Sequence, residues 1–422
     1  MNFDEANGYL LSLGNEVEAM KLGLENIRTL LTALGEPHEN YLKVQVAGTN
    51  GKGSVCAFLD SICGEAGIRR GLYTSPHLVS ITERIKIDGD DISESDFARL
   101  AALVRETSER LLAEGKLTYT PTFFEQVTAI ALTAFAEAKV ELAILETGLG
   151  GRLDATTAAN AEIAAITRIG LDHQEYLGDT IEEIAAEKAA IIREQTEAVL
   201  IGRQSPPVMN VLRDVIGEAH RRGVFVRETA VVFDESALGM PLRSLVGSLS
   251  LRGAHQVENA EVAILVADAL RTHFSIRDQD ISAGLRSAIH PGRLEYQDNF
   301  LLDGAHNVAG AEALAAYLDE FVDKPITMIF GAMKEKDISK IAKILWPRAE
   351  RVILTRPANI RALSPDGLLA QAPASIDRSK VVKTENVADA LEKAREVTPP
   401  GGMILVTGSL YLVGEVKKLF NN

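Results

Sequence analysis

The stretch Val46–Ser54, "VAGTNGKGS", follows an apolar segment that reads as a strand, and it decides how the chain is interpreted. It approaches the usual phosphate-loop pattern of Gly, four residues, Gly-Lys and Ser or Thr. It departs from that pattern twice, because position 46 is Val and a glycine separates Lys52 from Ser54. After it, apolar residues recur at helical spacing: Val55, Phe58, Leu59 and Ile62. The stretch therefore joins a strand to a helix, as an anion-binding loop or as a glycine-rich turn.

The chemistry of this stretch favours an anion site. Glycines at positions 48, 51 and 53 let successive N–H groups face an anion at the positive end of the following helix. Lys52 supplies a charge, and Ser54 supplies a hydroxyl that can reach Mg²⁺. A simple strand-to-helix turn remains the alternative for this motif taken alone.

Composition excludes several classes of protein. The 422 residues are enough for two or three domains of roughly 100 to 200 residues. A net charge of −15 argues against a nucleic-acid or anionic-membrane partner, because few cations are left to neutralise phosphates. The N-terminus lacks the pattern of a signal peptide and no apolar run approaches the ~20 residues of a membrane span, so we expect a cytoplasmic protein.

The two cysteines, Cys56 and Cys63, are seven residues apart on one expected helix. Their Cα atoms then lie roughly 10 Å apart along the axis, which is beyond disulfide reach. We expect both to be free and buried.

Strands alternate with helices along most of the chain, which predicts an α/β fold. Expected strands include "YLKVQVA", "RRGLYTS", "VELAILE" and "AEIAAITRI", and "TFFEQVTAIALTAFAEA" is expected to be helical. The predicted fold is an N-terminal, P-loop-type, doubly wound and mainly parallel sheet domain with a smaller C-terminal α/β, Rossmann-like domain. Residues 198–251, including "GVFVRETAVVF", look like peripheral structure.

A helix from about Gln256 to Arg271 precedes the breaker Pro291-Gly292, which suggests a boundary between domains spanning residues 1–294 and 295–422. Beyond it, "NFLLDGAHN", "PITMIFGAM", "RVILTR", "KVVKT" and "GMILVTGS" are five expected strands. Two such lobes commonly hold a ligand in the crevice between them.

Polar residues follow several of the expected strands. Glu146 ends one, Asp172 and His173 follow another, and Ser75 ends a third. At the carboxyl edge of a parallel sheet these residues would flank the loop and form a Mg²⁺ and phosphate site. A solvated strand-end acid, an exposed histidine and a Ser-Pro turn are the alternatives. Lys188, taken alone, reads as a cation on a helix surface.

Eight blocks in order carry a more specific resemblance. They are "VAGTNGKGS", "SPHL", "TFFEQVT", "LETGLGGRLDAT", "IGLDHQEYLGDTIEEIAAEKAAI", "HPGRLE", "LLDGAHN" and "VTGSLYLVGE". Together they resemble the folylpolyglutamate synthase/dihydrofolate synthase family of the Mur ligase superfamily. The resemblance implies that residues 1–294 form an ATP-binding, Mur-ligase-like domain and residues 295–422 a ligase domain. It also implies ATP-dependent addition of L-glutamate to folate through an acyl phosphate, with dihydropteroate as a further candidate acceptor.

The resemblance assigns the nucleotide and metal side of the site. ATP and Mg²⁺, as two ions, are the implied cofactors, with Ser75, Glu146 and His173 as metal ligands. Lys188 matches a lysine that becomes carboxylated, and Lys52 and His306 match catalytic positions. The implied ATP-binding residues are Asn50, Gly51, Lys52, Gly53, Ser54, Asn259, Arg293 and Asp303. Without the family, the last three and His306 read as a helix-surface amide, a hinge salt bridge, a strand-end acid and a loop histidine.

The resemblance also assigns the acceptor side. The implied substrate-binding residues are Lys21, Leu22, Gly23, Thr122, Phe123, Phe124, Glu125, Leu153, Asp154, Ala155 and Ser409. Phe123 and Phe124 are candidates to stack on a pterin ring, although helical spacing places one of them in the core. The family often has Asn after "DAT", where this chain has Thr157, which bears on the dihydrofolate synthase activity. For Ser409, a turn after the last strand is the alternative to contact with glutamate.

Two other functions stay open at this point. A muramyl-peptide ligase of the same superfamily is disfavoured by "GLGGRLDAT", by "DGAHN" and by the short segment before the phosphate loop. A nucleotide-binding regulator without catalysis is disfavoured by Lys52, Glu146, His173 and Lys188 together. A site within one polypeptide makes a monomer the expected state.

Overall fold

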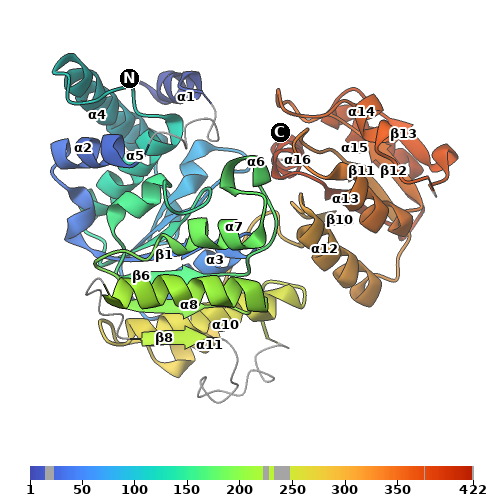
Figure 1. The fold of residues 1–422 in the computed structure, drawn as a ribbon. Helices are drawn as coiled ribbons and strands as arrows, with labels where there is room; N and C mark the ends of the chain where they lie inside the picture. The colour runs from blue at the N-terminus through green and yellow to red at the C-terminus, as the bar shows by residue number, and fades with distance from the viewer. Residues whose placement is uncertain (15–22, 222–227, 232–247, 375, 421–422) are drawn as a thin grey trace. The chain divides into compact units, whose positions relative to one another are not determined.

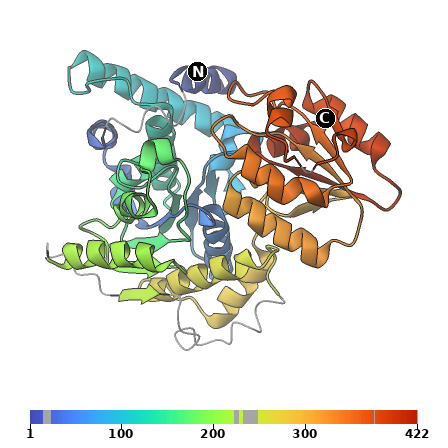
Figure 2. The ribbon, with the colours of Figure 1, turned by 45° about the vertical axis from the view of Figure 1, so that its right-hand side comes forward.

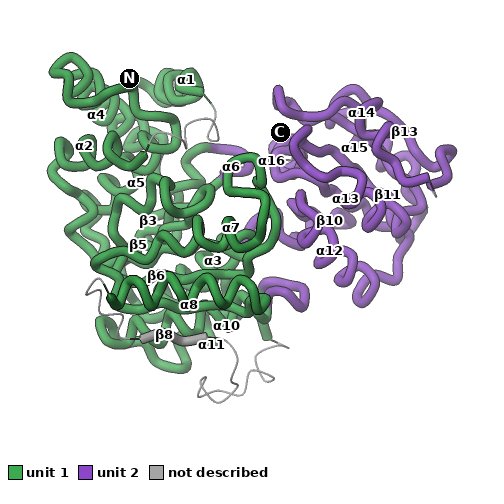
Figure 3. The backbone as a smooth tube through the Cα atoms, viewed as in Figure 1, with its two compact units in different colours: residues 1–75, 81–250, 257–289 green, residues 76–80, 251–256, 290–422 purple. Residues whose placement is uncertain are grey.

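The structure, a computed structural model, describes residues 1–14, 23–221, 228–231, 248–374 and 376–420. The chain divides into two compact units (Figure 3). Unit 1 comprises residues 1–75, 81–250 and 257–289, and unit 2 comprises residues 76–80, 251–256 and 290–422. The short segments 76–80 and 251–256 belong to unit 2. The predicted domains, residues 1–294 and 295–422, instead place both segments in the first domain.

Unit 1 is built on an eight-stranded sheet with the order β4-β3-β2-β5-β1-β6-β7-β8. Figure 1 labels β1, β6 and β8 of this sheet. Neighbouring strands are parallel from β2 to β8, and β3 and β4 add antiparallel pairs at one edge. The central strands are buried and mostly apolar, as strands covered on both faces are, although β1 also carries the buried Lys43 and Gln45. The strands are β1 Leu42–Ala47, β2 Arg70–Tyr73, β3 Ile85–Ile87, β4 Asp90–Asp91, β5 Leu142–Glu146, β6 Ile163–Ile166, β7 Ala198–Ile201 and β8 Glu228–Val231.

Residues 198–221 are part of the main fold, so the expectation of peripheral structure is wrong for them. β7 is fully buried and pairs with β6, and β8 continues the sheet. Pro206 and Pro207 begin helix α8 Pro206–Arg221, where proline is tolerated because the first N–H groups have no helical partner. Of "GVFVRETAVVF", only β8 lies within the described residues.

Among the described residues, the helices of unit 1 pack on the sheet in hydrophobic clusters. One cluster joins α1, α2, α4 and α5 to β2 and β5, and another joins α7 and α8 to β6 and β7. The long helix α4 stands out in Figures 1 and 2. The helices are α1 Phe3–Ser12, α2 Glu25–Ala33, α3 Lys52–Glu65, α4 Glu94–Ala113, α5 Phe123–Glu137, α6 Gln174–Leu177, α7 Ile181–Ala189, α8, α10 His255–Leu270 and α11 Asp278–Ser287.

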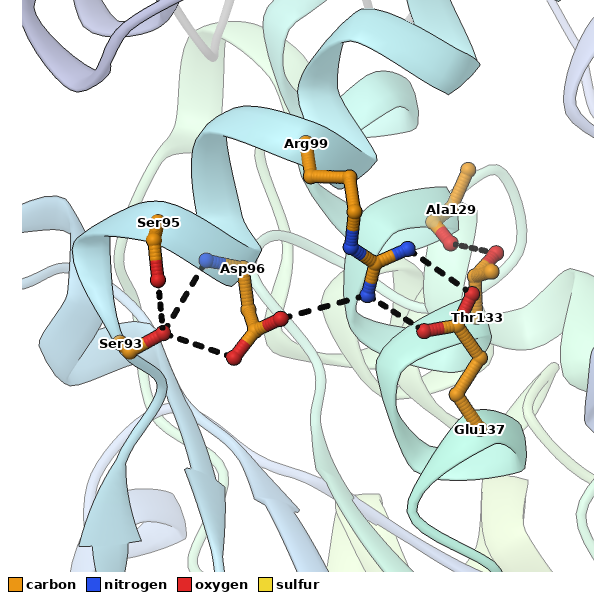
Figure 4. Close-up of polar contacts among 7 residues, drawn as sticks. All are labelled: Ser93, Ser95, Asp96, Arg99, Ala129, Thr133 and Glu137. Carbon is orange, nitrogen blue, oxygen red and sulfur yellow. Dashed lines mark hydrogen bonds and ion pairs between the residues drawn. The ribbon is translucent and has the colours of Figure 1, made fainter.

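A polar network on the surface links α4 to α5 (Figure 4). Arg99 pairs with Asp96 on its own helix at 3.3 Å and with Glu137 on α5 at 2.6 Å. Ser93 caps α4 by accepting a hydrogen bond from the backbone N–H of Asp96 at 3.0 Å. The hydrogen bond from the Ser93 hydroxyl, followed by the nearby Arg99, lowers the pKa of Asp96. The network is exposed, so it stabilises the helix pair only modestly.

Unit 2 contains a six-stranded sheet with the order β13-β12-β11-β14-β10-β9. The five predicted strands are present and parallel, and the unpredicted β9 adds an antiparallel edge next to β10. Its strands are β9 Glu295–Gln297, β10 Phe300–Leu302, β11 Ile326–Phe330, β12 Arg351–Leu354, β13 Val381–Lys383 and β14 Met403–Thr407. Its helices are α12 Val308–Phe321, α13 Ile338–Leu345, α14 Pro365–Ala370, α15 Val387–Val397 and α16 Leu410–Phe420.

These observations confirm the predicted α/β class, with a mainly parallel first sheet and a smaller second α/β unit. Cys56 and Cys63 are both free and buried on α3, as predicted. In the part of the chain that the structure describes, every helix is too short or too polar to cross a membrane.

Candidate active site

The phosphate-loop candidate lies between β1, the fifth strand in the sheet order, and α3. Gly51 caps α3 with a φ of 91°, and Gly48 has a φ of 151°. A Cβ at Gly51 would lie 2.1 Å from Asn259 Oδ1, and one at Gly48 would lie 1.8 Å from Thr167 Oγ1. Both positions therefore require glycine for conformation and for space. The close approach also brings the predicted Asn259, on α10, against the loop.

Hydrogen bonds to the segment after β6 hold the loop in place. The Thr49 hydroxyl donates to the carbonyl oxygen of Gly170 at 3.0 Å, and the Thr167 hydroxyl donates to that of Asn50 at 2.8 Å. The backbone N–H of Thr49 donates to the Arg168 carbonyl oxygen at 3.0 Å. The conformation is thus fixed before any ligand arrives, with Gly53 and the buried Ser54 in the first turn of α3.

Two lysine amines converge on one carbonyl oxygen of the loop. Lys188 Nζ, from α7, donates to Gly48 O at 2.9 Å, and Lys52 Nζ donates to the same oxygen at 3.2 Å. Lys188 is buried, with 4% of its surface exposed, so it is not the surface cation that the sequence alone suggests. Burial, followed by repulsion from Lys52, lowers the pKa of Lys188 from 10.5 to about 7. A large share of Lys188 is therefore an uncharged, nucleophilic amine near neutral pH.

Glu146 and Ser75 meet at the carboxyl edge of the same sheet. Glu146 ends β5 opposite Val46 of β1, and β2, which ends just before Ser75, pairs with the other side of β5. Glu146 is buried, and its Oε2 accepts a hydrogen bond from the backbone N–H of Ser75 at 3.1 Å. The strand order thus explains why residues far apart in sequence meet beside the phosphate loop.

His173 lies in the segment after β6, where it caps α6. Its φ of 50° is left-handed, a strained conformation for a side-chain-bearing residue that often marks a functional position. His173 Nε2 lies 3.9 Å from Asp172 Oδ2. The hydrogen bonds between Thr49 and Gly170 tie this segment to the phosphate loop.

The predicted metal ligands are one carboxylate, one imidazole and one hydroxyl. Among the described residues, no group of three or more His, Cys, Asp or Glu side chains is placed to hold a metal ion. Mg²⁺ usually keeps several waters and takes only one or two carboxylates besides substrate phosphates. A sparse set such as Glu146, Ser75 and His173 has the donor types of a magnesium–nucleotide complex rather than of a tight metal cage, and its role as the ligand set stays a prediction.

On the acceptor side, the structure gives Thr122 and Glu125 a local role as the capping box of α5. The Thr122 hydroxyl accepts from Glu125 N–H at 3.2 Å, and Glu125 Oε2 accepts from Thr122 N–H at 2.8 Å. Burial raises the pKa of Glu125. Phe123 and Phe124 both lie in the core cluster, at 3% and 9% exposure. Pterin stacking by Phe124 stays a prediction.

The loop of Leu153, Asp154 and Ala155 follows β5 and leads into η4 Ala155–Ala159. Asp154 Oδ2 accepts from Leu149 N–H at 2.9 Å, and Oδ1 accepts from Thr156 N–H at 3.0 Å. Burial raises the pKa of Asp154. Thr157, the departure from the family pattern, is fully buried and does not face solvent. Of the other predicted acceptor residues, Gly23 has a φ of 86°, and Lys21 and Leu22 lie outside the described residues.

In unit 2, the candidates Arg293, Asp303 and His306 are close in the fold. Asp303 follows β10, and its carboxylate accepts from Leu294 N–H at 3.0 Å and from Ala305 N–H at 2.9 Å. Burial raises the pKa of Asp303, although the Arg293 guanidinium opposes this. His306 Nδ1 lies 2.8 Å from Gly304 O, an acceptor, so Nδ1 carries a proton.

Two partly buried histidines accompany Arg293. Burial and then the Arg293 charge lower the pKa of His255 to about 4 and that of His290 to about 3. Both imidazoles are therefore neutral at physiological pH, so neither adds a positive charge beside the Arg293 guanidinium. The sequence shows the histidines but offers no sign of their partial burial.

Ser409 follows β14, the strand next to β10. It is buried, and its Oγ accepts from Tyr411 N–H at 3.1 Å. The N–H of Gly408 donates to Ala305 O at 3.1 Å, so the turns that contain Ser409 and Asp303 lie side by side. Within unit 2, the strand order therefore brings four predicted residues to one edge of the sheet: Arg293, Asp303, His306 and Ser409.

Two polar residues that hold these loops were not predicted, Thr167 and Gln45. Thr167 packs against Gly48, and Gln45 bonds to the segment around Thr156. The available signal was a polar residue within or directly after a strand whose neighbours are apolar, Gln45 between Val44 and Val46 and Thr167 after Ile166, since a buried polar side chain needs a partner.

Comparison with known families gives two matches. A Mur ligase middle domain matches residues 46–267, and a Mur ligase glutamate ligase domain matches residues 292–410. A "Probable bifunctional folylpolyglutamate synthase/dihydropteroate synthase" of Haloferax volcanii is 35% identical over 99% of this chain and 50% of its own. The chain thus spans about half the length of this relative.

Other relatives match over nearly their whole length. A dihydrofolate synthase/folylpolyglutamate synthase of Bacillus subtilis is 35% identical over 94% of this chain and 95% of its own. The folylpolyglutamate synthase of Mycobacterium tuberculosis with ADP and AMPPCP has a TM-score of 0.84 at 31% identity, covering 95% of this chain and 96% of that one. A Yersinia pestis bifunctional folylpolyglutamate synthase/dihydrofolate synthase with AMPPNP and Mn ion has a TM-score of 0.82 at 26% identity, covering 100% and 98%. The chain belongs to the folylpolyglutamate synthase/dihydrofolate synthase family of the Mur ligase superfamily.

Proposed function

We infer that this protein is an ATP-dependent ligase that adds L-glutamate to a folate, and also to dihydropteroate. The observation that carries the proposal is the convergence on one sheet edge of the preformed phosphate loop, the buried Glu146 and the low-pKa Lys188. The substrates are inferred from the names of relatives that this chain matches over nearly their full length. The two solved structures named above contain adenine nucleotides or their analogues.

The chemistry begins with a carboxylate, which is a poor acyl donor. A carboxylate oxygen of the acceptor attacks the γ-phosphorus of ATP, the bond to the β–γ bridging oxygen breaks, and ADP leaves. The amino group of glutamate loses one proton and attacks the acyl phosphate carbon, and the C–O bond to phosphate breaks. An amide forms as the nitrogen loses one further proton and keeps one. The first step joins two anions, so the N–H groups of the phosphate loop and the Lys52 amine stabilise the charge.

The proposed metal is Mg²⁺, bound as two ions, and Glu146, Ser75 and His173 would hold it. When bound, it neutralises phosphate charge and orients the γ-phosphoryl group. The buried Glu146 carboxylate supports this assignment, because an acid at the end of an apolar strand has no packing role.

Lys188 contributes as a carbamate. Its uncharged Nζ attacks the carbon of CO₂ and loses a proton, which turns an amine into an anionic oxygen donor. The pKa of about 7 supports the step, because only the uncharged amine has the lone pair that it needs. Conversion to an anion also removes the repulsion between the amines of Lys188 and Lys52.

Unit 2 supplies the remaining polar groups. Arg293 contacts ATP phosphates, Asp303 accepts hydrogen bonds from the ribose, and His306 faces the transferred phosphoryl group. Ser409 contacts the incoming glutamate. The acceptor binds along Lys21 to Gly23, Thr122 to Glu125 and Leu153 to Ala155. We further propose that the protein acts as a monomer in the cytoplasm.

The test is ADP release by the purified protein with ATP, Mg²⁺ and L-glutamate, with dihydropteroate and tetrahydrofolate as alternative acceptors and product identification by mass. Addition of glutamate to both acceptors supports the full proposal. Addition to tetrahydrofolate alone restricts the function to polyglutamylation. No addition to either acceptor overturns it.

A further inference from the structure

Gln45 on β1 and Thr157 in η4 meet beneath residues 148–155, which we name the 148–155 loop. Both side chains are fully buried. Gln45 Nε2 lies within hydrogen-bond distance of three hydroxyl oxygens, those of Thr157 at 2.8 Å, Thr156 at 2.9 Å and Thr147 at 3.1 Å, so its two protons are shared among the three acceptors. One amide thus reaches the end of β5 and both threonines that follow the loop.

The other hydrogen bonds fix the direction of the Gln45 amide. The Thr157 hydroxyl donates its only proton to Gly151 O at 2.7 Å, and the Thr156 hydroxyl donates to Asp154 Oδ1 at 2.5 Å. Both hydroxyls can therefore only accept from Gln45. Gln45 Oε1 is buried without a donor from the described part of the chain, which is an unfavourable arrangement. The orientation of the Gln45 amide therefore satisfies Nε2, which bonds to the threonine hydroxyls, and leaves Oε1 without a donor from the described residues.

The loop lies tightly between two predicted parts of the active site. A Cβ at Gly148 would lie 2.6 Å from the ring of Phe124, and one at Gly151 would lie 2.9 Å from Lys188 O. The N–H of Arg152 donates to Glu187 O at 2.9 Å. A movement of the loop therefore shifts its contacts with both Phe124 and the backbone of α7 at Lys188.

A purely structural cluster is the alternative, because satisfied buried polar networks often serve only stability. The position of the bonds favours a functional role. Thr157 bonds to Gly151, the residue that touches α7, and Thr156 bonds to Asp154, a predicted acceptor-binding residue. We propose that Gln45 and Thr157 are positioning residues that hold the 148–155 loop in the conformation that receives the folate acceptor. The substrate in this statement rests on the proposed function.

The matched variants are Thr157→Val, which removes the hydroxyl and keeps the shape, and Thr157→Ser, which keeps the hydroxyl. Thr157→Val is expected to raise KM for the acceptor about fivefold, as for the loss of one buried hydrogen bond, with KM for ATP changed less than about twofold. Thr157→Ser is expected to keep a near wild-type KM for the acceptor. Gln45→Met is expected to resemble Thr157→Val, and the double variant to show less than the product of the two effects.

Amide hydrogen exchange gives a readout that does not depend on turnover. In Thr157→Val, the N–H groups of Leu149 and Thr156 are expected to exchange faster than in the wild type, while those of β6 are unchanged. If exchange is faster but the wild-type protein ligates nothing, the proposed function fails and the holding of the loop stands. A lower melting temperature with unchanged acceptor KM and unchanged loop exchange overturns the inference. Should Thr157→Val not fold, Gln45→Met decides by the same two measurements.

Discussion

Lys52 and Lys188 donate hydrogen bonds to the same oxygen, Gly48 O, at 3.2 and 2.9 Å. Two ammonium groups on one acceptor repel each other, and Lys188 is also buried. The lower pKa of Lys188 follows from burial first and from Lys52 second. The loop that is expected to bind phosphate thus already contacts one lysine that gives up its proton easily.

The first prediction concerns stability and pH. The folded-state pKa of Lys188, about 7, is below its ordinary value of 10.5, so the unfolded chain binds more protons between these two values. The buried lysine therefore destabilises the fold fully below pH 7, and this cost disappears as the pH rises toward 10.5. The Lys188→Met variant has no amine to bury, so below pH 7 its free energy of unfolding is expected to exceed that of the wild type. This difference is expected to shrink as the pH rises from 7 to 10.5. Urea titrations of both proteins in CO₂-free buffer measure this, and an advantage that is constant with pH contradicts it.

The second prediction concerns the carbamate. Lys188→Ala is expected to lose at least about a hundredfold in kcat, because it removes a charged group from the phosphoryl-transfer site. Acetate, a small carboxylate, is expected to restore part of the activity by filling the space with an anion. The control is Lys116→Ala, an exposed lysine whose loss should leave kinetics unchanged. Rescue by methylammonium and not by acetate would show that the amine, rather than the carbamate, is the active form.

The third prediction concerns the metal. Glu146→Gln keeps an acceptor for the Ser75 N–H but removes the charge. The Mg²⁺ concentration for half-maximal activity is expected to rise about tenfold or more. Glu137→Gln, in the exposed network of Figure 4, is the matched control and should cost less than about 1 kcal/mol of stability without changing the Mg²⁺ titration. Equal Mg²⁺ titrations for Glu146→Gln and wild type exclude Glu146 as a ligand.

The fourth prediction compares two glycines with left-handed backbones. Gly67 has a φ of 74°, and a Cβ added there would meet no atom within 4 Å, whereas a Cβ at Gly51 would lie 2.1 Å from Asn259 Oδ1. Gly67→Ala is expected to cost about 1 kcal/mol of stability and leave KM for ATP unchanged. Gly51→Ala is expected to raise KM for ATP about tenfold or more, since it displaces Asn259 or the loop. Similar KM values for the two variants would count against a nucleotide at this loop.

The parallel strands and their carboxyl-edge residues could be predicted from the sequence because each signal is local. Apolar runs identify β1, β5 and β6, and parallel pairing then places Glu146 beside the phosphate loop. Lys188 could not be located in this way, because α7 carries it on a face whose burial depends on Gly48, far away in the chain.

Other features depend on contacts that the sequence does not display. The prolines at the start of α8 act as helix starters, which is clear only once β7 is known to lie inside the sheet. Strands β3, β4 and β9 are only two or three residues long, too short for a periodic pattern. Thr157 looks like a substrate-facing substitution in the sequence, but its partner is Gln45 on a distant strand.

One measurement tests the central claim most directly. A folate acceptor labelled with ¹⁸O in its glutamyl side-chain carboxylate is turned over with ATP, Mg²⁺ and L-glutamate, and the inorganic phosphate is examined by mass spectrometry. Ligation through an acyl phosphate transfers one labelled oxygen to phosphate for each glutamate added. Phosphate that carries no label while ATP is consumed would contradict the account.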